Sequence, residues 1–311
     1  KEDLREQTRR AAEKNCHKQN KHLSKGEKRN RKRMATVASV YSVAPYPRTP
    51  TMVAKEWYPN DKKAQRPKPV GKRVWASVEK SVETIVKEMF MEGLHHDSQK
   101  QKQWVALVDG NKTQIRLLKR QSKKMNIKLT IIVDIIHVLE YLWKAAYVFY
   151  PEGSKDAEQW VTENLFRILQ GKCSLMAANM RRQATRAELS KKQRKPVDKC
   201  AQYLLNYKEY LCYHHYLNQG YPIATGVIEG ACRYLIKDRM DRTGARWSLN
   251  GAEAVLKLRS LMSSGDFDAY WEFHEQQENI RHYNGIRKIF TKPELLNRQG
   301  QMYDYDLRKV A

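Results

Sequence analysis

The pattern of hydrophobic and polar positions predicts a few short strands among long helices. Residues 34–43 (MATVASVYSV) are rich in β-branched and aromatic side chains, which favours a strand. Residues 104–108 (WVALV) and 129–133 (LTIIV) are short apolar runs that each end at an aspartate, and they predict two buried strands. A proline-rich basic loop follows the first strand, with room for one short strand near residues 52–57.

Most of the remaining chain has helical periodicity. Strands that are apolar throughout and alternate with helices are typical of an α/β sheet layer covered by helices. A basic amphipathic helix is expected after residue 110. The other expected helices are residues 74–94, 137–150, several within 156–219, 226–240, 252–262 and 267–281.

The helical block that follows the α/β half suggests an insertion into the core. The expected organisation is a basic segment (residues 1–33), the first part of an α/β core (34–150), a helical insertion (151–220), core-completing helices (221–285) and a peripheral tail (286–311). The sequence starts at Lys1 rather than at a methionine, so we expect it to continue from something upstream.

The excess of basic residues indicates which kind of partner the chain binds. The chain has 59 Lys and Arg against 34 Asp and Glu, a formal charge of +25, which favours nucleic acid because cations release counterions from phosphates. No apolar run is long enough to cross a bilayer, so we expect a cytoplasmic protein with no membrane partner. The five cysteines form no C-x-x-C pair, which argues against a zinc ribbon, and no glycine-rich phosphate loop suggests an ATPase or dehydrogenase.

Acidic residues are scarce, so those at strand ends are candidate catalytic groups. Asp109 and Asp134 each end an apolar strand, where a carboxylate can bind Mg²⁺. The alternative, which spacing alone leaves equally open, is that Asp109 caps the next helix and Asp134 begins one. Glu229 is the third candidate, because Gly230 and Ala231 beside it leave room for a ligand.

Two basic rows are candidate DNA-binding surfaces, although a solvated charged helix is the commoner explanation of such patterns. One row lies in the expected insertion and the other follows Glu229. Their members are Arg181, Arg182, Arg186, Lys191, Lys192, Arg194 and Lys195, then Arg233, Lys237, Arg239, Arg242 and Arg246.

Four segments resemble bacterial insertion-sequence transposases of the ISKra-four group. They are GEKRNRKRMATVASVY (residues 26–41), VALVDG (105–110), DIIHVLEYLWKAA (134–146) and, most specifically, PIATGVIEGACRYLIKDRMDRTGARW (222–247). The resemblance covers about residues 1–285. It implies a ribonuclease-H-like α/β core with a helical insertion and C-terminal helices, and metal-dependent cleavage and strand transfer at insertion-sequence ends.

Carried over residue by residue, the resemblance makes Asp109 the second aspartate of a DDE triad and Glu229 its glutamate, with Mg²⁺ or Mn²⁺ as cofactor. Asp134 is the less favoured alternative to Asp109. The strand expected to carry the first aspartate is missing, since residues 34–43 contain no acid. The implied setting is the bacterial nucleoid, with a homo-oligomer acting on double-stranded transposon ends and target DNA. The alternatives are a catalytically inactive, decayed or repurposed fragment that only binds DNA, and an RNA-binding helical module, which lacks an aromatic ribonucleoprotein signature.

Overall fold

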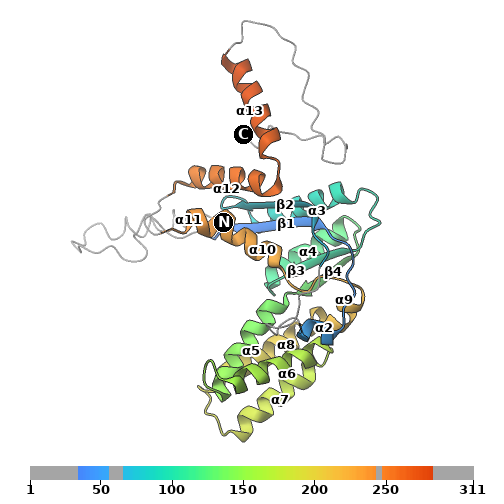
Figure 1. Cartoon of the computed structure of the whole chain (residues 1–311), viewed down its shortest axis with the longest axis vertical. Helices are drawn as coiled ribbons and strands as arrows, with labels where there is room; N and C mark the ends of the chain where they lie inside the picture. Colours follow the sequence, from blue (N-terminus) through green and yellow to red (C-terminus); the bar gives the residue numbers. More distant parts are fainter. Residues whose placement is uncertain (1–33, 56–65, 243–246, 283–311) are drawn as a thin grey trace, which may run out of the picture. The chain divides into compact units, whose positions relative to one another are not determined.

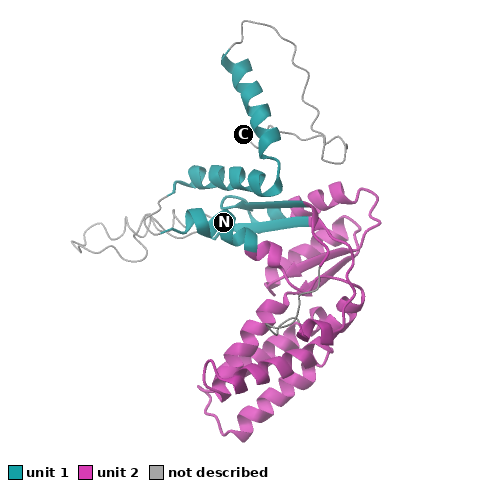
Figure 2. Cartoon of the chain, viewed as in Figure 1, with its two compact units in different colours: residues 1–40, 72–85, 230–311 teal, residues 41–71, 86–229 magenta. Residues whose placement is uncertain are grey.

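The computed structural model describes residues 34–55, 66–242 and 247–282, and it shows a mixed α/β protein that is mostly helical (Figure 1). The described strands form two small sheets of two strands each. The chain divides into two compact units (Figure 2): residues 1–40, 72–85 and 230–311 form unit 1, and residues 41–71 and 86–229 form unit 2. No helix in the described ranges has the length and apolar character needed to span a bilayer.

A strand pair and a helix fastened to it organise unit 1. The Ser264 hydroxyl accepts a hydrogen bond from the Val74 N–H (3.0 Å) and donates one to its carbonyl (3.2 Å). The buried Glu253 carboxylate accepts a hydrogen bond from the Val78 N–H (2.9 Å). These bonds connect α12 to β2 and the loop after it. The elements concerned are β1 (Thr36–Ser42), β2 (Val70–Ser77), α12 (Leu249–Ser264) and α13 (Phe267–His282).

Residues 226–240 are helical, as the sequence predicted, but the helix changes type along its length. A six-residue π-helix lies between two α-helical pieces, and such insertions often occur at functional sites. Arg259 of α12 donates to the Tyr234 carbonyl, one of the backbone groups in this segment. The three pieces are α10 (Gly226–Ala231), the π-helix η2 (Cys232–Lys237) and α11 (Asp238–Met240).

The sheet of unit 2 consists of two parallel strands with their ends in register. β3 (Trp104–Val108) pairs with β4 (Leu129–Val133), and Val108 lies opposite Val133. The connecting helix α4 (Lys112–Lys124) buries Ile115, Leu117 and Leu118. Both strands were predicted from their apolar runs, and their bounds agree with the prediction. The parallel arrangement brings the two carboxyl ends to one edge.

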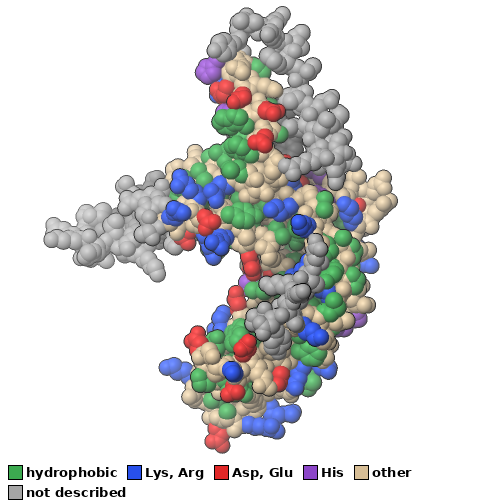
Figure 3. All heavy atoms as spheres, in the orientation of Figure 1, with side chains coloured by type: hydrophobic (Ala, Val, Ile, Leu, Met, Phe, Trp, Pro, Cys, Tyr) green, Lys and Arg blue, Asp and Glu red, His purple; other side chains and the backbone are tan. Residues whose placement is uncertain are grey.

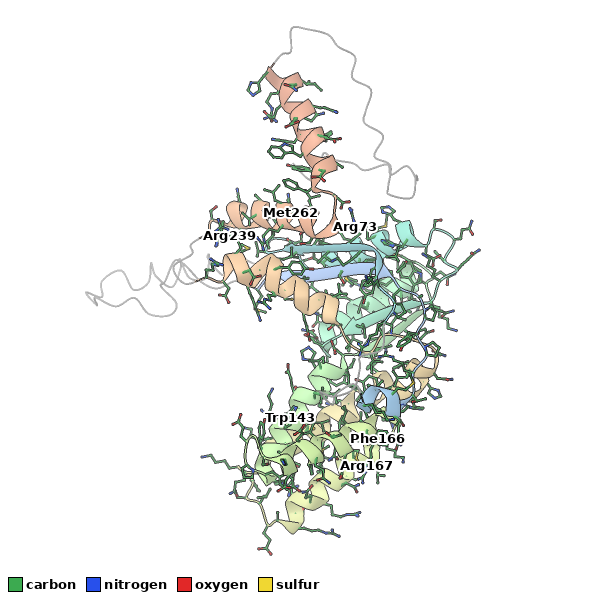
Figure 4. All side chains as sticks on the ribbon, in the orientation of Figure 1. Arg73, Trp143, Phe166, Arg167, Arg239 and Met262 are labelled. Atoms are coloured by element: carbon green, nitrogen blue, oxygen red, sulfur yellow. The ribbon has the colours of Figure 1, made fainter. Side chains whose placement is uncertain are left out.

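Helices make up the rest of unit 2. The four long helices α5 to α8 pack side by side, as Figure 1 shows. Trp143 projects from α5, and Phe166 and Arg167 project from α6 (Figure 4). The helices are α3 (Val82–His96, which begins in unit 1), α5 (Ile135–Phe149), α6 (Lys155–Leu169), α7 (Cys173–Arg186), α8 (Lys195–Asn206), η1 (Lys208–Tyr210) and α9 (Tyr213–Asn218).

Two sequence predictions were wrong. The expected strand near residues 52–57 is instead the helix α2 (Pro50–Lys55) as far as the structure describes it. Thr49 begins this helix by accepting hydrogen bonds from the Met52 and Val53 N–H groups, and proline suits the first helical position. The expected helix at residues 74–94 starts only at Val82, because the preceding segment extends β2 and Ser81 caps α3 by accepting the Thr84 N–H.

Candidate active site

The two aspartates at the strand ends lie next to each other across the sheet. Asp109 follows Val108 of β3, and Asp134 follows Val133 of β4, so the register places them at the same edge. The Asp134 N–H donates to the Val108 carbonyl (2.9 Å), which continues the strand pairing by one residue. Both aspartates predicted to end a strand therefore lie at the same sheet edge.

Asp134 is buried and its carboxylate is fully engaged. Its side chain is only 1% exposed. Oδ1 accepts the Ile136 N–H (2.8 Å), which caps α5, and Oδ2 accepts both the N–H (2.9 Å) and the hydroxyl of Thr225. The interpretation of Asp134 as the residue that begins a helix is confirmed. Three donors on one buried carboxylate leave little capacity for a metal ion.

Thr225 links this edge to the helix that carries Glu229. The chain before α10 is also held by the Ile135 N–H, which donates to the Ile223 carbonyl (3.0 Å). One turn beyond Thr225, the Glu229 N–H donates to the Thr225 carbonyl (3.2 Å). The Glu229 side chain is exposed, and no described group donates a hydrogen bond to its carboxylate. Asp134 thus anchors Glu229's helix beside the ends of β3 and β4.

Asp109 differs from Asp134 in exposure and in bonding. Its side chain is exposed, and Oδ1 accepts a single hydrogen bond, from the Asn111 N–H (2.8 Å). Asn111, whose Oδ1 accepts the Thr113 N–H (2.9 Å) and the Gln114 N–H, caps α4. The alternative in which Asp109 caps this helix is therefore wrong. Among described donors none reaches its second carboxylate oxygen, so Asp109 has oxygen lone pairs available for a cation.

Three tyrosines from the helical part of unit 2 donate hydrogen bonds to backbone carbonyls at this edge. They were not among the residues predicted from the sequence. Tyr213 donates its hydroxyl to the Val133 carbonyl (2.7 Å), Tyr207 donates to the Gly110 carbonyl, and Tyr203 donates to the Asp109 carbonyl (3.4 Å). Burial raises the pKa of all three hydroxyls, and the negative charge of Asp109 raises the pKa of Tyr203 and Tyr207 further. The hydroxyls therefore stay protonated as donors.

The available sequence signal for these contacts was the i, i+4 spacing of Tyr203, on the apolar face of α8, and Tyr207, which follows the last residue of that helix. Tyr141 of α5 stacks on Tyr203 with ring centroids 4.1 Å apart. The helices of the expected insertion (residues 151–220) thus contact the turns that follow β3 and β4.

Two arginines of the first basic row form ion pairs within the protein. Arg194 donates two hydrogen bonds to the Asp198 carboxylate (2.9 and 3.3 Å), and Arg181 approaches the same carboxylate at 3.7 Å. Arg181 thus pairs across from α7 to α8, whereas Arg194 pairs within the first turn of α8. The other members are exposed and have no carboxylate partner within the described chain: Arg182, Arg186, Lys191, Lys192 and Lys195.

The described members of the second basic row belong to unit 1 and are exposed. Arg233 lies 3.8 Å from the Asp238 carboxylate, and Arg242 donates to the Asp238 carbonyl (2.7 Å). Arg239, labelled in Figure 4, lies over the Trp247 ring, 5.4 Å from its centroid. Lys237 is exposed, whereas Arg246 lies outside the described residues. Figure 3 shows Lys and Arg side chains gathered around α11, which fits an anion-binding surface.

Two of the predicted site residues have the chemistry that suits a hard divalent cation. Asp109 and Glu229 supply exposed carboxylates, the ligands that Mg²⁺ prefers. However, no group of three His, Cys, Asp or Glu side chains in the described ranges is placed to hold a metal ion. Comparison of the chain with protein-family models, with curated proteins and with solved structures finds no match.

Proposed function

We propose that this chain functions in a DDE-type transposase, with a ribonuclease-H-like core, that cleaves and joins DNA at insertion-sequence ends. One observation carries the proposal. The hydrogen bonds from Thr225 to Asp134 attach the helix of Glu229 to the sheet edge where Asp109 ends β3. This attachment supports the proposal that two carboxylates separated by 120 residues in the sequence act at one edge, as the resemblance of VALVDG and VIEG to transposase motifs implies.

Each residue of this edge has a distinct role in the proposal. Asp109 and Glu229 bind the metal through exposed carboxylates, and Asp134 positions them without binding it. When bound, Mg²⁺ lowers the pKa of a bound water and neutralises the oxygen that leaves the scissile phosphodiester. Asp109 and Glu229 would hold the ion, which would supply this activation to a water in cleavage and to a 3′ hydroxyl in strand transfer. The resemblance implies a third carboxylate, and no group of three such side chains within the described ranges supplies it.

The basic rows hold the substrate in this proposal. Exposed cations such as Arg182 and Lys191 in one row and Lys237 in the other are suited to DNA phosphates. Together with the net charge of +25, they support double-stranded DNA as the partner. The proposed setting is the bacterial cytoplasm, where the protein acts on the nucleoid as a homo-oligomer.

The test is a cleavage assay on the protein produced in its natural reading frame. The substrate is a labelled duplex made from the genomic DNA that borders the gene, incubated with Mg²⁺ or Mn²⁺. We expect nicking that requires the metal and falls by roughly 100-fold or more in Asp109→Asn and in Glu229→Gln, as when a transition-state-stabilising group is lost. The matched control is Glu152→Gln, an exposed acid in the turn after α5.

Two results would reject the enzyme. Salt-sensitive duplex binding without cleavage in either metal would show a protein that only binds DNA. Full activity in Asp109→Asn or Glu229→Gln would place the chemistry elsewhere in the molecule.

A further inference from the structure

Helix α4, which follows Asp109 directly, has an exposed basic face beside a shallow hollow. Lys112, Arg116 and Lys119 follow one another at helical spacing and line the hollow, whose volume is about 330 Å³. Asn206, Tyr207 and Tyr210 form its other side. None of these residues belongs to the two basic rows described above.

A hydrogen bond connects the wall of the hollow to the turn that carries Asp109. Tyr207, one of its walls, donates its hydroxyl to the Gly110 carbonyl, the residue after Asp109. Lys112 lies three positions beyond Asp109 in the sequence, at the first turn of α4. A ligand in this hollow would therefore lie close to the proposed scissile phosphate.

The charge of α4 is not compensated within the helix. Its sequence, KTQIRLLKRQSKK, contains six Lys and Arg and no acid. Lys112 lies in the first turn, where the helix dipole disfavours a cation, and neither it nor Arg116 is paired with a carboxylate of the described chain. A helix face that serves only solubility usually carries acidic residues at i, i+4 from its basic ones. Binding of an external anion is therefore the better explanation of the uniformly basic face of α4.

The dimensions and the aromatic wall point to a nucleic acid strand. From Lys112 to Lys119 the helix rises by about 10 Å, so its three cations can lie along a short stretch of a DNA strand. Lys119 lies over the Tyr210 ring, 5.2 Å from its centroid. The neighbouring Tyr210 side chain and, to a smaller extent, the Glu209 carboxylate raise the pKa of Lys119, so the amine stays charged. Cations that follow a backbone beside an aromatic ring are typical of sites for unpaired nucleotides.

We propose that the α4 face, defined by Lys112, Arg116, Lys119 and Tyr210, binds an unpaired segment of the DNA strand next to the cleavage position. The three cations contact consecutive phosphates, and one nucleotide enters the hollow against Tyr210. This inference rests on the proposed function, because it assumes that the DNA strand passes Asp109. It adds a binding site at which an unpaired strand is distinguished from a duplex.

The test compares binding of two fluorescent DNAs, a blunt duplex and the same duplex with a five-nucleotide single-stranded overhang, by anisotropy at several salt concentrations. The variant is K112Q/R116Q/K119Q. The control, K144Q/K155Q/K199Q, removes the same charge from exposed positions of α5, α6 and α8. We expect the α4 variant to lose at least tenfold in affinity for the overhang substrate. The slope of log affinity against log salt should fall by about 2, at roughly 0.7 per phosphate of a single strand.

Tyr210→Leu supplies a second readout, because it removes the stacking surface and keeps every charge. We expect it to weaken the overhang substrate roughly tenfold, as for loss of one stacked base, and to leave the blunt duplex unchanged. Equal losses in the α4 variant and the control variant would overturn the inference, as would tighter binding of a single-stranded RNA of the overhang sequence. If cleavage by the wild-type protein is intact in that case, the proposed function stands and only the α4 site fails.

Discussion

The two strand-end aspartates should respond very differently to substitution, although their sequence contexts are alike. Asp134 is 1% exposed and accepts three hydrogen bonds, from the Ile136 N–H and from the N–H and hydroxyl of Thr225. Asp109 is exposed and accepts one, from the Asn111 N–H. Asp134→Ala therefore leaves the Ile136 and Thr225 donors without a hydrogen-bond acceptor inside the protein. In Asp109→Ala, by contrast, the Asn111 N–H can donate to water.

The expected cost follows from these bonds. Loss of the α5 cap costs about 1 kcal/mol. Loss of the two Thr225 bonds to a buried carboxylate costs roughly 1–3 kcal/mol each, less than additively. We therefore expect Asp134→Ala to lower the free energy of unfolding by about 3–5 kcal/mol, and Asp109→Ala by less than about 1 kcal/mol. Thr225→Val, which keeps its N–H, should lose about 1 kcal/mol.

Thermal and urea unfolding monitored by circular dichroism measure these differences. At about 2–4 °C per kcal/mol for a chain of this class, Asp134→Ala should lower Tm by about 10 °C. The urea slope should be unchanged, which would show that the denatured state is the same. Equal Tm values for Asp134→Ala and Asp109→Ala would refute the assignment of a positioning role to Asp134 and a solvent-facing role to Asp109.

Two further predictions concern packing and alkaline stability. A Cβ added at Gly93 would lie 2.4 Å from the Trp104 ring, so Gly93→Ala should destabilise the fold by about 1–3 kcal/mol in urea titrations. Gly226→Ala, where a Cβ meets nothing within 4 Å, should have no such cost, and an equal loss would contradict the packing. Burial raises the pKa of the Cys200 thiol from 9.0 to about 12, so the native state retains a proton that the unfolded chain releases above pH 9. Stability should therefore fall by about 1.4 kcal/mol between pH 8 and pH 10 through this group alone, and Cys200→Ala should show a smaller fall; an identical pH dependence would exclude this contribution.

Local patterns predicted the elements that hold the candidate acids. The apolar runs before Asp109 and Asp134 were sufficient to predict two strands, because a short buried strand consists of consecutive apolar residues. The parallel pairing then follows from the alternation of strands and helices, and it places both acids at one edge. The helix bearing Glu229 was also predictable from its own sequence.

Contacts between distant segments were not predictable in this way. Thr225 and Asp134 are 91 positions apart, and nothing in the periodicity of either segment indicates that they bond. The same applies to Tyr213, whose hydroxyl reaches the Val133 carbonyl from the helical insertion. Near β2 the error was local: Val78 and Val82 fit one helical face by spacing, yet the chain changes from strand to helix between them, at Ser81.

In the proposed function, Asp109 and Glu229 bind the same divalent ion. Electron paramagnetic resonance of Mn²⁺ titrated into the purified chain measures this without requiring catalysis. We predict one weakly bound Mn²⁺, whose affinity falls about tenfold or more in Asp109→Asn and equally in Glu229→Gln, with no change in Glu152→Gln. Unchanged Mn²⁺ affinity in either of the two variants would contradict the account.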